Sequence, residues 1–217
     1  MRLVSVNVGL PREVKWEAGS VITGIFKNPV QGPVMARTLD LDGDGQADLS
    51  VHGGAHKAIY AYPSEHYSYW RRELSVTEMP YGMFGENFTT EAVLEDEVHI
   101  GDRFRVGTAE LVVTQPRLPC YKLGLKFGRD DMVKRFLASG RTGFYLSVSR
   151  EGEVEAGRRL ESTHRDPAGV TIPEITRLYV SKHYSPADVE KLHRVLEVPA
   201  LPESWRKYFL ERLQRPG

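Results

Sequence analysis

One segment of the sequence carries the residues best suited to covalent or metal chemistry. It reads Gln115-Pro116-Arg117-Leu118-Pro119-Cys120-Tyr121-Lys122 and holds the only cysteine of the chain. Its two prolines remove backbone donors and stiffen the loop. The cations Arg117 and Lys122 favour a thiolate, which is both the nucleophile and the soft metal ligand. A lone cysteine is often buried and inert, so the residues alone leave a reactive or ligating Cys120 and an inert one equally open.

A second segment, His52-Gly53-Gly54-Ala55-His56-Lys57, precedes a predicted strand and has the composition of an anion site. Paired glycines let the backbone approach a ligand closely and can direct N–H groups at an anion. His56 and Lys57 would add cationic donors beside them. A tight turn with solvated side chains explains the same residues equally well, so both interpretations stay open.

Two further segments are weaker by themselves. In Gly85-Glu86-Asn87-Phe88, Asn87 could donate to a ligand oxygen and Glu86 could position a proton. Asx and Gly residues also build turns for purely local reasons, and we favour the turn. The fourth segment, Lys27-Asn28-Pro29-Val30, lies at a strand end, where a solitary lysine is usually solvated.

An acidic run, Asp40-Leu41-Asp42-Gly43-Asp44-Gly45, resembles the start of an EF-hand loop. Such a loop needs an entering helix and a bidentate Glu at its twelfth position. That position is Val51, and no helix is predicted before the run. We interpret the run as an acidic, glycine-rich surface turn and expect no calcium site. The sequence also lacks zinc-ligand spacing, a Walker loop, a dinucleotide fingerprint and a nucleophile elbow.

The elements that must position these segments are mainly short strands separated by Gly and Pro. Alternating apolar residues predict strands at 2–10, 20–27, 57–62 and 144–148, and a hairpin of 103–106 with 109–115 turned at Gly107. Many short strands of this kind indicate a barrel or sandwich rather than a parallel α/β sheet.

Two helices are predicted among these strands. Ser64 is a plausible N-cap for the first, whose apolar stripe contains Tyr67, Trp70 and Leu74. The second is predicted to open at Asp130-Asp131 and to stop at Gly140, because glycine adopts the left-handed conformation that ends a helix. Its apolar side contains Met132, Val133, Phe136 and Leu137.

After about residue 168 the sequence becomes helical. Thr171-Ile172-Pro173-Glu174 and Ser185-Pro186-Ala187-Asp188 both have the spacing of a capping box. Two apolar stripes follow, made of Val189, Leu192, Val195 and Leu196 and of Trp205, Tyr208, Phe209 and Leu213. So few residues could hardly bury a core alone. We therefore expect three short helices that pack on the barrel or on a partner.

Composition excludes several classes of function. The 217 residues hold 29 Lys and Arg against 29 Asp and Glu, a formal net charge of +0, whereas a protein that grips nucleic acid shows a basic excess. A single cysteine rules out an intramolecular disulfide. The N-terminus lacks the apolar core of a signal peptide, and no run approaches the ~20 apolar residues of a membrane span. We expect a cytoplasmic protein without a nucleic-acid or membrane partner.

The same segments, in this order, resemble the MOSC family, named for the C-terminal domain of molybdenum cofactor sulfurases, and the C-terminal helices resemble the extension of its YiiM branch. The matching pieces are Lys27-x-Pro29-Val30, Asp44-Gly45-Gln46-Ala47-Asp48, Val51-His52-Gly53-Gly54, Ala58-x-x-x-Tyr62-Pro63, Phe84-Gly85-Glu86-Asn87, Ile100-Gly101-Asp102 and Gln115-Pro116-Arg117-x-Pro119-Cys120. The His-Gly-Gly and Pro-Arg-x-Pro-Cys pieces are the most specific. The resemblance implies a mainly β fold, a MOSC β-barrel with peripheral helices over 1–168, and a three-helix subdomain over 169–217.

The resemblance also implies a pocket for the molybdenum cofactor, a pterin dithiolene that ends in a phosphate, with no pyridoxal phosphate. Cys120 matches the cysteine that ligates molybdenum in related amidoxime-reducing enzymes, and Lys27 matches a lysine near the cofactor phosphate. The further cofactor-binding residues that the resemblance suggests are Arg37, His52, Gly53, Gly54, His56, Lys57, Asn87, Gln115 and Arg117.

The implied reaction is the two-electron reduction of N-hydroxylated compounds, including toxic hydroxylaminopurines, to the N–H compound and water. Cys120 would be catalytic, and Glu86 and His52 are the residues we expect to supply protons. Because the chain has no flavin or iron–sulfur motif, an external flavin-containing reductase would supply the electrons. Two alternatives stay open: a sulfur carrier with a persulfide on Cys120, and a module that only binds or delivers the cofactor. A homodimer also stays open.

Overall fold

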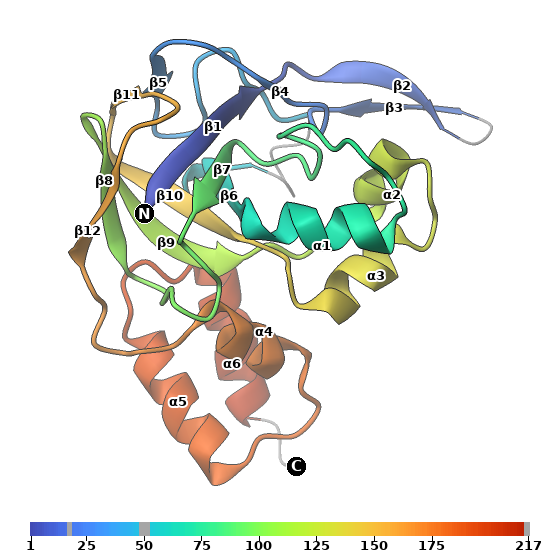
Figure 1. The fold of residues 1–217 in the computed structure, drawn as a ribbon. Coiled ribbons are helices and arrows are strands. Elements are labelled where there is room, and N and C mark those ends of the chain that lie inside the picture. The colour runs from blue at the N-terminus through green and yellow to red at the C-terminus, as the bar shows by residue number, and fades with distance from the viewer. Residues whose placement is uncertain (17–18, 48–52, 215–217) are drawn as a thin grey trace.

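A curled, eight-stranded sheet forms the body of the protein in the computed structural model, which describes residues 1–16, 19–47 and 53–214 (Figure 1). The strand order is β12-β8-β9-β10-β6-β7-β1-β4, and only the β6–β7 pair is parallel. The strands are β1 (Arg2–Val8), β4 (Asn28–Pro29), β6 (Ile59–Pro63), β7 (Phe88–Glu91), β8 (Arg103–Val106), β9 (Ala109–Pro116), β10 (Phe144–Arg150) and β12 (Leu160–His164).

The sheet curls far enough for its two ends to meet. The Leu3 N–H donates to the Arg158 carbonyl at 2.9 Å, and the Leu160 N–H donates to the Met1 carbonyl at 3.1 Å. These bonds bring the start of β1 beside the start of β12 and close much of the barrel, which removes exposed strand edges. The predicted barrel is confirmed, and so is the hairpin of β8 and β9 turned at Gly107.

Two small two-stranded sheets lie outside this sheet. β2 (Arg12–Trp16) pairs with β3 (Gly19–Thr23) in an arm that projects from the body, and β5 (Val34–Ala36) pairs with β11 (Gly152–Val154). The predicted strand 20–27 was too long, because the chain leaves the arm at Gly24. A Cβ on Gly24 would lie 2.3 Å from the Gly45 carbonyl oxygen, so the backbones are in close contact there.

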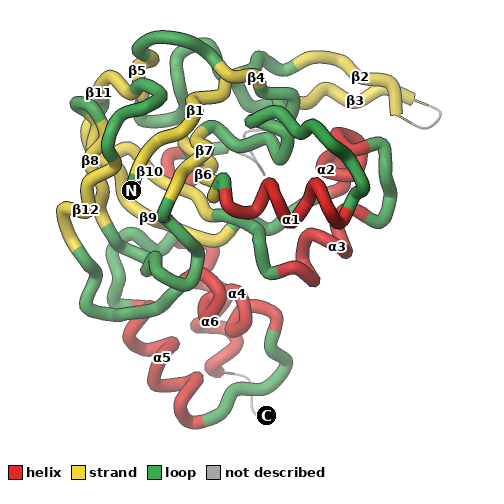
Figure 2. Tube along the Cα trace, in the orientation of Figure 1, coloured by secondary structure: helices red, strands yellow, loops and turns green. Residues whose placement is uncertain are grey.

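Three helices cover one side of the barrel around a second, aromatic core (Figure 2). They are α1 (Glu65–Glu73), α2 (Tyr121–Phe127) and α3 (Met132–Ser139). In this core the Trp70 indole N–H donates to the Tyr62 hydroxyl at 2.7 Å, and the Phe84 and Phe136 rings pack against both residues. α1 and α3 confirm the predicted helices, including the stop at Gly140, whose φ is 67°. α2 was not predicted.

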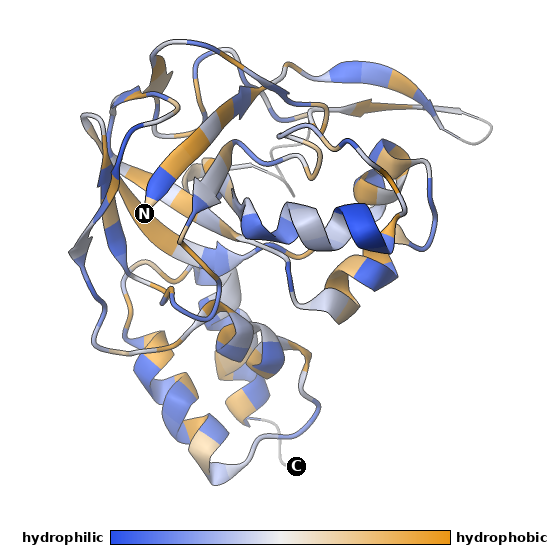
Figure 3. Ribbon diagram, viewed as in Figure 1, coloured by the Kyte–Doolittle hydropathy of each residue, from blue (hydrophilic) through white to orange (hydrophobic). Residues whose placement is uncertain are grey.

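The three C-terminal helices pack on the barrel, one of the two predicted arrangements. They are α4 (Ile172–Val180), α5 (Pro186–Leu196) and α6 (Glu203–Gln214). Both capping boxes are present, at Thr171 and at Ser185. The apolar stripes visible in Figure 3 belong to the same core as the sheet, through Ile175, Leu192 and Phe209. None of the helices in the described ranges is both long and apolar enough to span a membrane.

Candidate functional site

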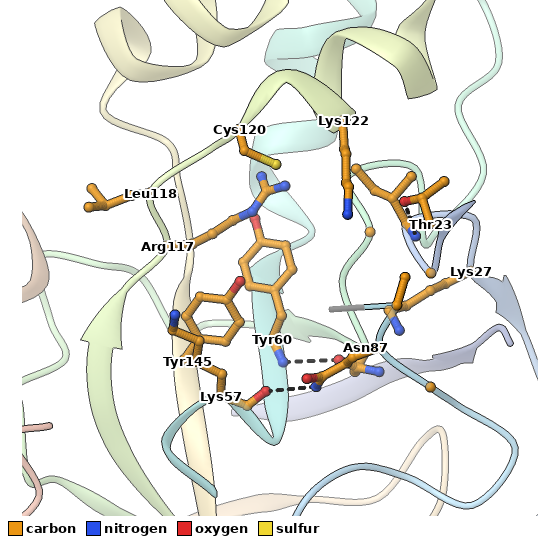
Figure 4. Close-up of a pocket in the computed structure, with 16 residues that line it drawn as sticks. Thr23, Lys27, Lys57, Tyr60, Asn87, Arg117, Leu118, Cys120, Lys122 and Tyr145 are labelled. Atoms are coloured by element: carbon orange, nitrogen blue, oxygen red, sulfur yellow. Dashed lines mark hydrogen bonds between the residues drawn. The ribbon is translucent and has the colours of Figure 1, made fainter. Parts of the chain in front are cut away.

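A cavity of about 650 Å3, counting its open mouth, lies where the barrel meets the α2 side of the molecule (Figure 4). Strands β6 and β10, the turn before β6 and the loops around β7, β3 and α2 all contribute to it. The lining residues are Thr23, Gly24, Ile25, Lys27, Gly45, Gln46, Ala47, Lys57, Tyr60, Gly85, Asn87, Arg117, Leu118, Cys120, Lys122 and Tyr145.

Cys120 lines this cavity from the segment between β9 and α2. Its backbone is extended, it occupies the N-cap position of α2, and its half-buried side chain makes no capping bond. In Figure 4 the sulfur, the Arg117 guanidinium and the Lys122 amine approach the same space from one short stretch of chain. The predicted stiff platform therefore presents the thiol together with both of its neighbouring cations.

Arg117 is the most unusual donor of the cavity. Its side chain is only 6% exposed, and the guanidinium carbon lies 4.7 Å from the Tyr60 ring centroid and 5.2 Å from that of Phe136. Within the described part of the chain, its buried Nη1 atom has no hydrogen-bond partner. Because buried guanidinium donors are normally satisfied, the atom marks a position for an acceptor from a ligand.

The surroundings of Arg117 keep it charged. Burial by itself lowers the pKa of Arg117, but the electrostatic influence of Tyr60, Tyr145 and Cys120 outweighs burial, so the pKa is raised overall. The charge is also spread over aromatic faces, which stabilise a cation without using its N–H groups. Arg117 can therefore offer a permanent positive charge to an anionic ligand.

A buried ion pair supports the opposite side of the cavity. Lys27 donates to both carboxylate oxygens of Asp44, which also accept from the Gly9 N–H at 2.9 Å and from Asn87 Nδ2 at 2.7 Å. Burial lowers the pKa of Lys27, and Asp44 opposes this effect. The same Asn87 accepts from the Tyr60 N–H at 3.1 Å, so it ties the pair to β6.

This pair corrects two expectations. The acidic run 40–45 was interpreted as a surface turn, yet only part of it is: Asp42 is exposed, whereas the Asp44 side chain is 1% exposed. The segment alone suggested a solvated Lys27, whereas the resemblance placed it near the cofactor; its side chain is 7% exposed and lines the cavity. Each charge offsets the cost of burying the other. Because the partners are distant in the sequence, the neighbours of each residue could not show that it is buried.

The lining of the cavity is basic. Lys27, Lys57, Arg117 and Lys122 contribute to it, and the described residues that line it include no Asp or Glu. Lys57 is half-buried, and burial lowers its pKa. A concave surface that gathers cations raises the local concentration of anions. The arrangement is suited to a ligand that carries a phosphate or a similar group.

The structure thus brings five predicted residues into one cavity: Lys27, Lys57, Asn87, Arg117 and Cys120. His52 lies outside the described residues, as do Asp48 and Val51 of the quoted motifs. Gly53 and Gly54 do not line the cavity. Gly54 opens the turn η1 (Ala55–Lys57) with a φ of 93°, a conformation that glycine adopts readily.

Three other predicted cofactor-binding residues lie elsewhere. Arg37 is exposed and forms ion pairs with Asp42 and Glu151. The His56 side chain is exposed, and its carbonyl accepts from the sheet. Gln115 is buried between His56 and the C-terminal helices and does not reach the cavity.

Glu86 was expected to handle a proton, but its position indicates a structural role. The carboxyl group is fully buried and is not among the residues that line the cavity, and burial raises its pKa. It accepts hydrogen bonds from the Tyr67 hydroxyl, from the Gly82 N–H at 2.8 Å and from the Phe84 N–H at 3.0 Å. These bonds order the loop that leads into β7, so Glu86 positions its neighbour Asn87 at the cavity.

Sequence reasoning missed several residues of the cavity, among them Tyr60, Tyr145, Thr23 and Gln46. Tyr60 and Tyr145 lie in strands that were predicted, and the alternation of side chains along those strands was the available signal. This alternation shows which residues lie on the same face of a strand as Tyr60 or Tyr145, but it does not show which face of the sheet borders a cavity.

Comparisons with known proteins agree with this architecture. Residues 48–161 match the family model described as the MOSC domain, and residues 170–215 match a YiiM-like, 3-alpha helix domain. The protein YflK of Bacillus subtilis is 38% identical over 98% of this chain and 95% of its own length. The protein YiiM of Escherichia coli is 37% identical over 88% of this chain and 84% of its own length.

The chain is also similar to a solved structure and to part of a longer protein. The crystal structure of YiiM from Geobacillus stearothermophilus superposes with a TM-score of 0.80, at 35% identity, over 98% of both chains. A protein of Gibberella moniliformis named reductase is 30% identical over 77% of this chain, which corresponds to 30% of that longer protein.

Proposed function

Because the chain belongs to the MOSC family and to its YiiM branch, we propose that it is a molybdenum cofactor-dependent reductase of N-hydroxylated compounds, with hydroxylaminopurines among its substrates. The observation that carries the proposal is the cavity shared by the Cys120 thiol and Arg117, whose buried Nη1 atom has no hydrogen-bond partner among the described residues. The reaction would detoxify base analogues. The relative named reductase supports a redox function.

The residues present fit a cofactor that ends in a phosphate. Arg117 offers a buried donor without a partner among the described residues, and Lys57 and Lys122 add positive charge at the same cavity. Lys27 also lines the cavity, but Asp44 already compensates its charge. Cys120 would be the protein ligand of the metal. No group of three or more His, Cys, Asp or Glu side chains gathers in the described ranges, so a metal here would need ligands from the cofactor itself.

The proposed reaction converts an N–OH group to N–H and water with two electrons and two protons. When bound, the cofactor would supply a metal that exchanges two electrons, with the Cys120 thiolate as its protein ligand. The chain itself binds and orients: Arg117 and the lysines would hold the anionic part, and the Tyr60 and Tyr145 rings line the cavity on the side of Arg117. A separate flavin-containing reductase would supply the electrons.

The first test is the molybdenum content of the protein produced in cells that make the cofactor. We expect near-stoichiometric metal in the wild type and a sharp loss in Cys120→Ala. Arg37→Ala is the matched control, because Arg37 is exposed and lies away from the cavity. Metal absent from the wild type would overturn the reductase proposal. A persulfide on Cys120, detected by mass spectrometry in metal-free protein, would then favour a sulfur carrier.

The second test is turnover of the metal-loaded protein. A chemically reduced electron donor and 6-hydroxylaminopurine should yield adenine, measured by chromatography, with the wild type and Arg37→Ala but not with Cys120→Ala. Stoichiometric metal without turnover, for several N-hydroxylated substrates and candidate reductases, would indicate a protein that binds or delivers the cofactor.

A further inference from the structure

The side-chain amide of Gln115 links the C-terminal helices to the turn that carries Lys57. Its Oε1 atom accepts from the Trp205 indole N–H of α6 at 2.6 Å, and its Nε2 atom donates to the His56 carbonyl at 3.3 Å. Both linking side chains are buried, with Gln115 3% and Trp205 6% exposed. The contact joins residues 90 positions apart in the sequence.

The indole determines which way the amide points. The Trp205 side chain can only donate, so the amide must turn its oxygen toward α6. The amide NH2 group is then directed at the His56 carbonyl. A reversed amide would place its NH2 group against the Trp205 indole N–H and its oxygen against the His56 carbonyl oxygen. Neither of these buried pairs could form a hydrogen bond.

The His56 carbonyl belongs to the peptide that leads into Lys57. The Thr114 hydroxyl lies 2.6 Å from the same carbonyl, next to Gln115 on β9. On the other side of the turn, the Lys57 N–H donates to the Gly54 carbonyl at 2.8 Å, and Gln46 Nε2 donates to the Lys57 carbonyl at 3.2 Å. These bonds hold the backbone of Lys57 on both sides while its side chain lines the cavity.

We propose that Trp205 and Gln115 are positioning residues, through which the C-terminal three-helix unit holds the turn η1 in place and aims Lys57 into the cavity. The inference assigns to α6 a role in the site that it does not touch. It rests on the proposed function only in its last step, namely that Lys57 meets an anionic ligand. The positioning itself is a property of the chain without any ligand.

Trp205→Phe is the first variant for a test. Phenylalanine keeps an aromatic ring near Tyr179 and Phe209, whose ring centroids lie 4.6 and 5.8 Å from that of Trp205, but it removes the N–H donor. Tyr208→Phe is the matched control on the same helix. It removes the hydrogen bond from the Tyr208 hydroxyl to the Tyr179 carbonyl and a long one, at 3.5 Å, that the hydroxyl accepts from Arg212, and neither involves Gln115.

The readout is amide hydrogen exchange of residues 53–58 in the full chain without cofactor, measured by mass spectrometry. We expect Trp205→Phe to accelerate exchange of this turn by about three- to tenfold, the range that loss of one buried hydrogen bond corresponds to. Tyr208→Phe should leave the turn unchanged. Exchange of the turn that is equal in Trp205→Phe and Tyr208→Phe would overturn the proposal, because Trp205 would then only pack α6 on the barrel.

A double-mutant cycle tests whether Trp205 acts through Gln115. In a Gln115→Met background, which already lacks both amide bonds, Trp205→Phe should not accelerate exchange of the turn any further. A further acceleration of the same size would show that the route does not pass through Gln115 and would overturn the proposed link.

Molybdenum content of the same variants separates this inference from the proposed function. If both hold, Trp205→Phe made in cofactor-competent cells should retain less metal than Tyr208→Phe. If exchange of the turn responds as expected while the wild type holds no metal, the positioning role stands and the proposed function fails. If Trp205→Phe leaves exchange of the turn unchanged while the wild type is fully loaded with molybdenum, the positioning role fails and the proposed function stands.

Discussion

The substitution Asp44→Asn tests the ion pair that supports the cavity. The side chains of Lys27 and Asp44 are 7% and 1% exposed, so the lysine cannot find water when its partner loses its charge. Removing one member of a buried pair typically costs about 3 to 5 kcal/mol, because an uncompensated charge remains inside. Asparagine can still accept from the Gly9 N–H, so we place the loss of unfolding free energy near the lower end, at about 3 kcal/mol.

The pH dependence of this loss has a definite sign. Burial lowers the pKa of Lys27 in the folded protein below its ordinary value of 10.5, and removing the Asp44 charge lowers it further. Between the folded pKa and 10.5, the unfolded chain binds more protons than the folded chain, so the free energy of unfolding rises with pH across that window. The deficit of Asp44→Asn should therefore shrink as the pH increases from neutral.

Urea unfolding at neutral and alkaline pH measures both quantities. Asp42→Asn is the control, since Asp42 lies in the same turn and its ion pair with Arg37 is exposed and screened by solvent, which predicts little or no loss of unfolding free energy. If Asp44→Asn costs no more than Asp42→Asn at neutral pH, the description of a buried, mutually dependent pair is wrong.

Three other predictions concern Lys126, Gly143 and Arg117. Burial lowers the pKa of Lys126 to about 8 in the folded protein. Between about pH 8 and 10 the unfolded chain therefore binds more protons at Lys126 than the folded chain, and the free energy of unfolding rises with pH. Lys126→Met should flatten this rise. Gly143→Ala should destabilise the protein by about 2 to 4 kcal/mol in urea titrations, since its φ is 67° and its Cβ would lie 2.4 Å from the Ala61 carbonyl oxygen. Gly128→Ala, with a φ of 63° but open space, should lose only about 1 kcal/mol, and equal losses would refute the steric argument. Arg117→Lys should lower molybdenum content at least several-fold in metal analysis, because lysine lacks the planar fork that stacks on two rings; full metal loading would contradict the assigned role.

Local patterns in the sequence predicted much of the fold. The capping boxes at Thr171 and Ser185, the stop at Gly140 and the hairpin turned at Gly107 depend on neighbours within a few residues, and all are present. The elements that were missed lack such patterns. α2 has seven residues with Gly124 in its middle, which is kept by the close approach of the Arg129 carbonyl, 2.8 Å from the position of a Cβ.

The candidate site divides in the same way. Cys120, its two stiffening prolines and its cationic neighbours are adjacent in the chain, so their chemistry could be predicted from residue types and spacing. Family resemblance added Lys27, Lys57, Asn87 and Arg117 as members of one site, and the cavity contains all four. The same reasoning also suggested Arg37, which the structure places in an exposed ion pair.

By itself, then, the sequence determined the class of fold, the family and the one thiol around which a site could form, because each is written in periodicity, local motifs or residue type. Tertiary structure alone decided which polar and charged groups meet. Lys27 and Asp44 are 17 positions apart, and Gln115 and Trp205 are 90 apart. Whether such groups pair, and whether Nη1 of Arg117 keeps a donor for a ligand, depends on burial and on directions of side chains that are set only when the barrel, α2 and α6 pack together.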